Sequence, residues 1–208
     1  MKPMEIEKQS FEIIARELAR RGLKTDPEHD MVVRRVIHTT ADFDYFENLT
    51  FSKHAMRALK SALQSGCDVV TDTTMAQAGI NKGLLKRFGG QTRCFIADED
   101  VREEAARRGV TRSWVCMEKA ARLEKPLILA IGNAPTALQA ICALTRAGSM
   151  RPEAVIGVPV GFVNVVEAKG ELMRLPVEYI VSRGRKGGSN VAAAIVNAAL
   201  YQLIEREE

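Results

Sequence analysis

The chain has 208 residues, which is enough for one large domain with a substantial core. Its 46% hydrophobic and 27% charged residues are typical of an ordinary soluble globular protein. A formal net charge of +4 is too small to predict a nucleic-acid coat, although it suits a small polyanionic ligand. The 5% aromatic content argues against a base-stacking surface, so we expect no nucleic-acid partner.

The four cysteines are widely spaced and form no C-x-x-C pair, and only three histidines accompany them. No zinc-type ligand grouping is visible, so we expect no metal site and free thiols in a reducing cytosol. The N-terminus lacks the apolar segment of a signal peptide. The most apolar run, 155–163, is short and interrupted by glycine and proline, so we expect a cytoplasmic protein with no membrane span.

The first expected element is a helix over 4–21. Gly22 provides a stop signal, and apolar residues recur at near-helical spacing at Ile6, Phe11, Ile14 and Leu18. Ser10 lies inside this helix, where its hydroxyl either bonds back to the helix or faces a polar group. A break at Thr25-Asp26-Pro27 separates this helix from the next one, at 28–39.

The remainder of the chain alternates short apolar runs with helical stretches. We expect strands at 68–71, 92–97, 127–131, 154–158 and 178–181. Further helices are expected at 53–65, in a short stretch ending at Ala78, and at 81–88, 99–108, 114–123, 136–147, 165–172 and 190–205. Ser113 is the expected N-cap of the helix at 114–123.

This alternation predicts right-handed crossovers and a sheet covered on both faces. The run 127–131 is apolar throughout, as in strands that are buried on both sides. No internal repeat or interdomain linker is visible. We therefore expect an α/β fold, a three-layer α/β/α arrangement with a mostly parallel sheet and an N-terminal helical arm, as one domain over 1–208.

His38 is the first candidate for chemistry. It follows Arg35 by three residues and Arg34 by four, so a helix would place both guanidinium groups near the imidazole. A titratable ring beside fixed positive charge can hold an anionic substrate and pass it a proton. The alternative is a partly buried helix histidine with two solvated arginines.

Ligands bind outside the carboxyl ends of strands in open parallel sheets. The glycine-rich segment 183–189 (RGRKGGS) follows a predicted strand and opens the last helix. Glycine backbone and a helix N-terminus both favour an anion, either a phosphate or a carboxylate. The alternative is a basic, flexible turn.

Three familiar motifs are absent: the P-loop order, a Gly-x-Gly-x-x-Gly after the first strand, and a Gly-x-Ser-x-Gly elbow. A nucleotide-dependent protein that binds phosphate with segment 183–189 remains one hypothesis. The residues alone predict an α/β protein that binds something anionic near His38.

Eight collinear stretches together resemble the precorrin-8X methylmutase family, and most closely its cobalt-precorrin-8 branch. They are 7–11 (EKQSF), 35–44 (RVIHTTADFD), 71–75 (TDTTM), 79–82 (GINK), 109–113 (GVTRS), 132–138 (GNAPTAL), 157–163 (GVPVGFV) and 184–189 (GRKGGS). The phrases at 37–42 and 79–82 favour the cobalt-containing branch.

The resemblance implies an isomerase that moves a methyl group from C11 to C12 of a corrinoid ring during cobalamin biosynthesis. It implies a homodimer with a corrinoid substrate bound at or near the subunit interface. Because the methyl group never leaves the molecule, no cofactor is expected, and any cobalt belongs to the substrate. A non-catalytic tetrapyrrole-binding protein is the alternative.

The resemblance also assigns roles to residues. His38 matches the proton donor and acceptor, and Ser10 and Arg35 match positions that contact substrate. Asn81 and Arg112 match further site positions, although some relatives carry a hydroxyl side chain where Asn81 stands. After Val163 this chain has NVVEAK, whereas the family usually has GAAESK, a change that narrows the pocket or repacks the start of a helix.

Overall fold

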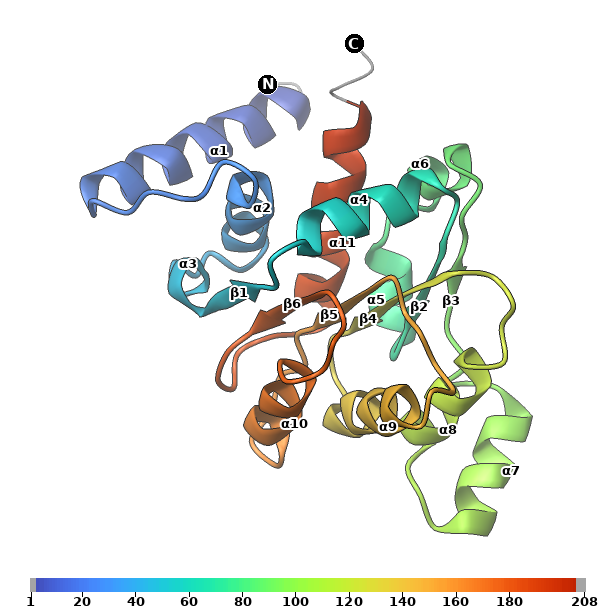
Figure 1. The fold of residues 1–208 in the computed structure, drawn as a ribbon. Coiled ribbons are helices and arrows are strands. Elements are labelled where there is room, and N and C mark those ends of the chain that lie inside the picture. Colours follow the sequence, from blue (N-terminus) through green and yellow to red (C-terminus); the bar gives the residue numbers. More distant parts are fainter. Residues whose placement is uncertain (1–2, 205–208) are drawn as a thin grey trace.

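A single sheet organises the chain in the computed structural model, which describes residues 3–204. Its six strands run in the order β1-β6-β5-β4-β2-β3 (Figure 1). Their bounds are β1 (Leu49–Phe51), β2 (Asp68–Thr71), β3 (Thr92–Arg93), β4 (Leu127–Ile131), β5 (Ala154–Gly157) and β6 (Tyr179–Ser182). Only β1 pairs antiparallel, with β6, so the described sheet is mostly parallel, as predicted.

Helices cover both faces of the sheet (Figure 1). On one side lie α1 (Pro3–Arg20), α2 (Asp30–Thr40), α4 (Ala55–Gln64) and α11 (Ser189–Ile204). On the other side lie α7 (Glu99–Arg108), α8 (Arg112–Ala120), α9 (Pro135–Arg146) and α10 (Val165–Leu172). The short helices are α3 (Tyr45–Asn48), α5 (Thr74–Gly79) and α6 (Lys82–Arg87). The predicted three-layer α/β/α fold is confirmed.

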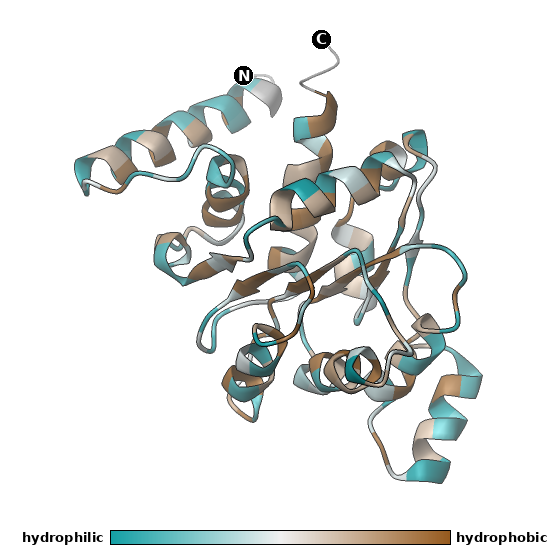
Figure 2. Cartoon of the chain, viewed as in Figure 1, coloured by the Kyte–Doolittle hydropathy of each residue, from teal (hydrophilic) through white to brown (hydrophobic). Residues whose placement is uncertain are grey.

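Strand alternation divides the core into two apolar clusters. Neighbouring strand residues point to opposite faces, so Ile128 joins the cluster under α11 whereas Leu129 joins the cluster under α9. Both residues have no exposed surface, as expected for a strand covered on both sides. Figure 2 shows this as continuous brown colouring along the central strands.

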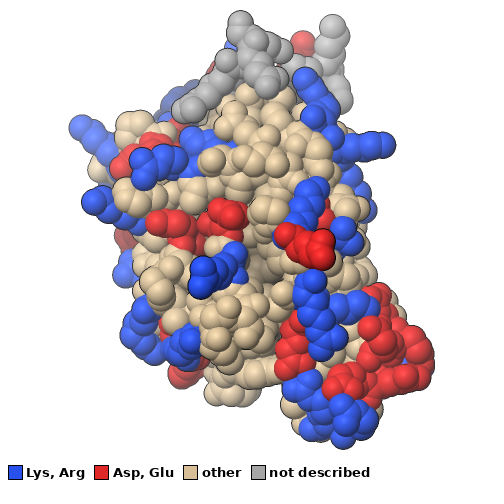
Figure 3. Space-filling model, turned by 45° about the vertical axis from the view of Figure 1, so that its right-hand side comes forward, with Lys and Arg blue, Asp and Glu red and all other residues tan. Residues whose placement is uncertain are grey.

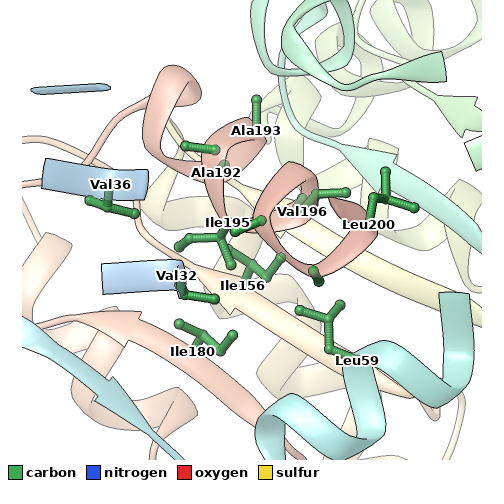
Figure 4. Packing of buried hydrophobic residues seen from close by; sticks show 14 of the residues in the cluster. Val32, Val36, Leu59, Ile156, Ile180, Ala192, Ala193, Ile195, Val196 and Leu200 are labelled. Carbon is green, nitrogen blue, oxygen red and sulfur yellow. The ribbon is translucent and has the colours of Figure 1, made fainter. Parts of the chain in front are cut away.

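Helix α11 is the centre of the first cluster. It is apolar on almost every side, which is the pattern of a fully buried helix. Its Ile195 and Val196 lie among Val32 and Val36 of α2 and Leu59 of α4 (Figure 4). The N-terminal arm α1 adds Ile14 and Leu18 to this cluster and packs on α2.

Several expected boundaries were wrong. The predicted strand at 92–97 is reduced to β3, because the chain turns after Arg93 and Asp98 N–H donates to the carbonyl of Phe95. Ser113 is not the N-cap of α8; Thr111 is, since its hydroxyl accepts from the N–H of Trp114 at 3.2 Å. The sequence patterns also missed α3 and β1 entirely. Residue 205, at the end of the last predicted helix, lies outside the described residues.

Three buried thiols make the free energy of unfolding depend on pH in the alkaline range. Burial raises the pKa of Cys67 and Cys116 to about 12 and that of Cys142 to about 11, from a value of 9.0. The folded state therefore retains thiol protons that the unfolded chain loses above pH 9. The stabilisation by the protonated thiols is fully present below pH 9. It is lost as the pH rises toward 12.

We expect each thiol to lower the free energy of unfolding by about 1–2 kcal/mol between pH 8 and about pH 10.5. Urea titrations of the wild type and of Cys116→Ala at both pH values check this, because the other titrating groups are common to both proteins. The pH-dependent loss should be smaller in Cys116→Ala. Equal losses in the two proteins would contradict the assignment.

Candidate active site

Helix α2 presents Arg35 and His38 on the side away from the sheet. Its apolar face, including Val36 and Ile37, is buried against α11, so the next residue, His38, points outward and is exposed. Arg35 lies one turn earlier, and its side chain is only 15% exposed. Helical periodicity thus brings the two residues to one side, as the spacing predicted.

Helix α1 supplies the second wall. The ring of Phe11 lies with its centroid 5.4 Å from that of His38 and also 4.9 Å from the guanidinium carbon of Arg35. Tyr201 of α11 contributes another ring, 4.7 Å from the same guanidinium carbon. Arg35 therefore contacts two aromatic rings, which hold its planar group in one orientation.

The guanidinium of Arg35 is paired with a carboxylate, but not all of its N–H donors have a hydrogen-bond partner within the described part of the chain. Its Nη2 lies 2.6 Å from Oε1 of Glu7, a carboxylate that is 46% exposed. Its Nε is buried and has no hydrogen-bond partner among the described residues. Because the Glu7 carboxylate is half-exposed, an incoming acid can exchange with it at Nη2 of Arg35.

A hollow of about 560 Å³ opens beside this arginine, between α1, α2 and α11. It is lined by Glu7, Lys8, Phe11, Met31, Arg34, Arg35, Tyr201 and Ile204. Three of these residues are cationic and one is anionic, so the hollow favours an acidic ligand. His38 touches its wall through Phe11 but does not line it.

Ser10 takes the first of its two predicted arrangements. Its hydroxyl donates to the carbonyl of Ile6 at 2.9 Å, within α1. The oxygen keeps a lone pair for a further donor. Ser10 lies on the same helix as Phe11, but it does not line the hollow.

Asn81 is joined to Arg35 through Tyr201. Its side-chain oxygen caps α6 by accepting from the N–H of Leu84 at 3.0 Å, and its Nδ2 lies 3.5 Å from the hydroxyl of Tyr201. Its backbone N–H donates to Asn197 of α11 at 2.8 Å. The structure therefore brings Asn81 to the same end of α11 as Arg35.

Arg112 is the one predicted site residue that stands apart. It is exposed at the start of α8, on the face of the sheet opposite α2 (Figure 1). Its Nη1 lies 3.5 Å from the carbonyl of Ile96. Among residues 5–204 it makes no hydrogen bond or ion pair with any of the other four site residues.

The glycine-rich segment 183–189 is held from several sides and is not a free turn. Lys186 Nζ lies 2.6 Å from a carboxylate oxygen of both Asp42 and Asp44. Arg183 donates to the carbonyl of Glu47 at 3.0 Å, and the Arg185 guanidinium lies 5.4 Å from the centre of the Phe162 ring. Each of the three cations that the sequence analysis proposed for binding an anion therefore has a contact within the protein.

Two buried ionisable residues, Lys169 and Asp72, hold loops at the carboxyl edge of the sheet. Lys169 is 1% exposed, and burial lowers its pKa to about 8. Asp72 is also 1% exposed, and burial raises the pKa of its carboxyl. Asp72 accepts backbone N–H bonds from Gly132 at 2.9 Å, Asn133 at 2.8 Å and Ala134 at 2.7 Å.

Glu7, Phe11 and Tyr201 also line the hollow, and the sequence analysis singled out only the stretch that contains Glu7 and Phe11. Tyr201 had a usable signal, since it is a lone aromatic residue at the end of an alanine- and valine-rich helix. Spacing cannot reveal its partner, because Tyr201 meets Arg35 only when α11 packs on α2.

The departure at 164–166 lies at the start of α10. Asn164 adopts a left-handed conformation with φ of 56°, which asparagine tolerates better than most residues other than glycine. Val165 is fully buried, and Val166 is 46% exposed. None of the three lines the hollow beside Arg35.

Over the part of the chain that the structure describes, no helix has the length and apolar character needed to cross a membrane. In the same residues, no group of three or more His, Cys, Asp or Glu side chains could hold a metal ion. Basic and acidic side chains are interspersed on the face seen in Figure 3 and form no continuous basic surface there.

Comparison with known proteins identifies the family. The precorrin-8X methylmutase family model matches residues 5–202. The chain is 46% identical to the cobalt-precorrin-8 methylmutase of Salmonella typhimurium over 207 residues, covering 98% of this chain and 97% of that protein. The enzyme of the same name from Priestia megaterium is 43% identical over 198 residues, covering 95% and 87%.

A solved structure titled as the precorrin-8x methyl mutase from Thermus thermophilus superimposes with a TM-score of 0.86. It is 38% identical in sequence, and the match covers 97% of this chain and 98% of that one. The resemblance seen in the eight stretches is therefore confirmed over nearly the whole length. The chain belongs to the precorrin-8X methylmutase family.

Proposed function

We propose that this chain, a single methylmutase domain over residues 1–208, moves a methyl group from C11 to C12 of cobalt-precorrin-8 in cobalamin biosynthesis. The methylmutase activity follows from membership of the family, whose members are isomerases. The observation that carries the site assignment is the surface shared by Arg35 and His38, with Phe11 in contact with both. It lies beside a hollow of about 560 Å³.

His38 is the proposed proton donor and acceptor. When a ring nitrogen of the corrinoid is protonated or hydrogen-bonded, its π-system becomes electron-poor, and the barrier to methyl migration falls. The proton returns to the imidazole after migration, so the reaction consumes nothing. General acid catalysis of this kind contributes typically ~10²–10⁴-fold to the rate.

Arg35 is proposed to bind one of the acetate or propionate carboxylates on the macrocycle. The aromatic rings of Phe11 and Tyr201 already orient its guanidinium, and the buried Nε is an unused donor. A substrate carboxylate would replace Glu7 and form charge-assisted hydrogen bonds with the guanidinium of Arg35. Ser10 and Asn81 would contact the substrate from neighbouring positions.

Arg112 fits this scheme in a homodimer, in which it would reach the active site of a second copy. Mixing His38→Ala and Arg112→Ala subunits tests this arrangement. Each variant alone should be nearly inactive. Re-association in equal amounts should restore about one quarter of the wild-type rate, because half of the dimers are mixed and each holds one intact site. Mixtures that stay inactive, although mixed dimers form, would place Arg112 elsewhere.

No cofactor is proposed, since the migrating methyl group stays on the substrate, and cobalt would arrive already bound in the macrocycle. Assaying cobalt-loaded and metal-free substrates in parallel tests the choice of branch. We expect a higher kcat/KM for the cobalt form. The absence of a membrane-spanning helix in residues 3–204 is compatible with a cytoplasmic site of action.

Absorbance spectra test the proposed function directly. An isomerase converts the chromophore of the substrate, whereas a non-catalytic tetrapyrrole-binding protein leaves the released ligand unchanged. Unchanged spectra for both the cobalt-loaded and the metal-free substrate would refute the proposal. Titration calorimetry with ATP and NAD addresses the nucleotide alternative, and we expect no micromolar binding of either.

A further inference from the structure

The end of helix α2 is held by a contact that the proposed chemistry does not use. The ammonium group of Lys186 lies 2.6 Å from Oδ2 of Asp42 and 2.6 Å from Oδ2 of Asp44. Asp42 is four residues beyond His38. The two carboxylates raise the pKa of Lys186, so the lysine is fully charged at neutral pH. We name this arrangement the Lys186 clamp.

The loop that carries Lys186 is anchored from beneath. Lys169 Nζ donates to the carbonyls of Gly184 and Lys186, both at 2.8 Å, and the hydroxyl of Ser182 donates to the carbonyl of Lys186 at 2.8 Å. Gly187 lies so close to the next loop that a Cβ would come within 2.1 Å of the carbonyl oxygen of Val158. The base of the clamp is therefore fixed to the body of the fold.

The last turn of α2 is supported on its inner side, since the chain returns to the core at Tyr45, which is 3% exposed. The buried face of α2 ends at Ile37, whereas His38 and Thr39 are both exposed. The helix is closed by Ala41, a residue with a Cβ that adopts φ of 53°. Such a conformation costs free energy and persists only when the surroundings hold it. A helix end that is exposed on one side frays unless the following residues are fixed.

We propose that Lys186 is a positioning residue for His38, because its clamp on Asp42 and Asp44 holds the last turn of α2 against the anchored loop. This inference rests on the proposed role of His38. Lys186 touches neither the imidazole nor the hollow beside Arg35. It acts on the reaction only through the position of the helix end.

The clamp also accounts for the glycine-rich segment. A free anion at Lys186 would have to displace two carboxylates that already bind it at 2.6 Å. The glycines allow the loop to pass close to Val158, where no side chain fits. The segment thus works as a spacer between the sheet and α2 and not as a phosphate cradle.

Lys186→Met tests the inference, because methionine keeps most of the unbranched apolar stem of lysine and removes the charge. We expect kcat to fall at least about tenfold, since a displacement of about 1 Å of a catalytic group can cost 10²-fold. KM should change less than about twofold, because Arg35 is untouched. Lys186→Arg should restore most of kcat, since a guanidinium can also bridge two carboxylates.

The chain provides a matched control on its opposite side. Lys119 bridges Asp98 at 2.8 Å and Asp100 at 2.7 Å, again two aspartates separated by one residue. Its side chain is 31% exposed, compared with 44% for Lys186. Lys119→Met removes an equivalent surface clamp, so it should lower the melting temperature to a similar extent while leaving kcat unchanged.

The outcomes separate the inference from the proposed function. If His38→Ala is inactive but Lys186→Met turns over like Lys119→Met, the positioning role is refuted and the function stands. If His38→Ala retains full activity, the proposed role of His38 fails, and the positioning role of Lys186 fails with it, whereas unchanged substrate spectra with the wild type would refute the function itself. Should Lys186→Met fold poorly, Asp44→Asn removes half of the clamp at a position that is 66% exposed. That variant should then reduce kcat by an intermediate factor, and an unchanged kcat would overturn the inference.

Discussion

Replacing His38 with alanine should lower turnover by ~10²–10⁴-fold, which is the range typical of a lost general acid. The imidazole is exposed at the end of α2, so its removal creates no cavity in the core. Substrate affinity should change less than about threefold, because Arg35 and its aromatic neighbours remain in place. Single-turnover absorbance changes measure the chemical step, and fluorescence quenching by the corrinoid measures binding.

His54→Ala is the control for this experiment. His54 is half-buried at the N-cap position of α4, and its side chain makes no capping hydrogen bond. Its variant should turn over at the wild-type rate. A fully active His38→Ala variant would remove the proposed mechanism, whatever the behaviour of the control.

Replacing Asp72 with alanine should lower the free energy of unfolding by about 3–5 kcal/mol, because buried backbone donors lose their partner. The carboxylate accepts from three consecutive N–H groups at the start of the β4–α9 connection. Gly132 and Ala134 are buried, so water cannot readily replace the lost acceptor. Urea denaturation monitored by circular dichroism gives the change directly.

Asp26 provides the comparison for Asp72. It is exposed and accepts a single backbone N–H bond, from Glu28 at 2.8 Å. Asp26→Ala should therefore cost less than about 1 kcal/mol. A comparable loss for the two alanine variants would show that burial of the Asp72 carboxylate is not what makes its hydrogen bonds important.

Local patterns were sufficient for most of the fold. The apolar run of β4 and the periodicity of α2 and α9 identify these elements because each pattern repeats within a few residues. By contrast, β1 has three residues and pairs with β6, about 130 positions later in the chain. So short a strand carries no periodic signal of its own, and only its distant partner makes it a strand.

The same division applies to the candidate site. The neighbourhood of Arg35 and His38 was readable from their spacing, because an α-helix places residues three and four apart on one side. The contacts of Arg35 with Phe11 and Tyr201, and the clamp that joins Lys186 to Asp42 and Asp44, could not be predicted from the sequence. These partners come from different helices and loops, and they meet only because α1 and α11 bury their apolar faces against α2. Helix geometry decides which neighbours a residue has along the chain, whereas the packing of the two apolar clusters decides which distant side chains complete the site.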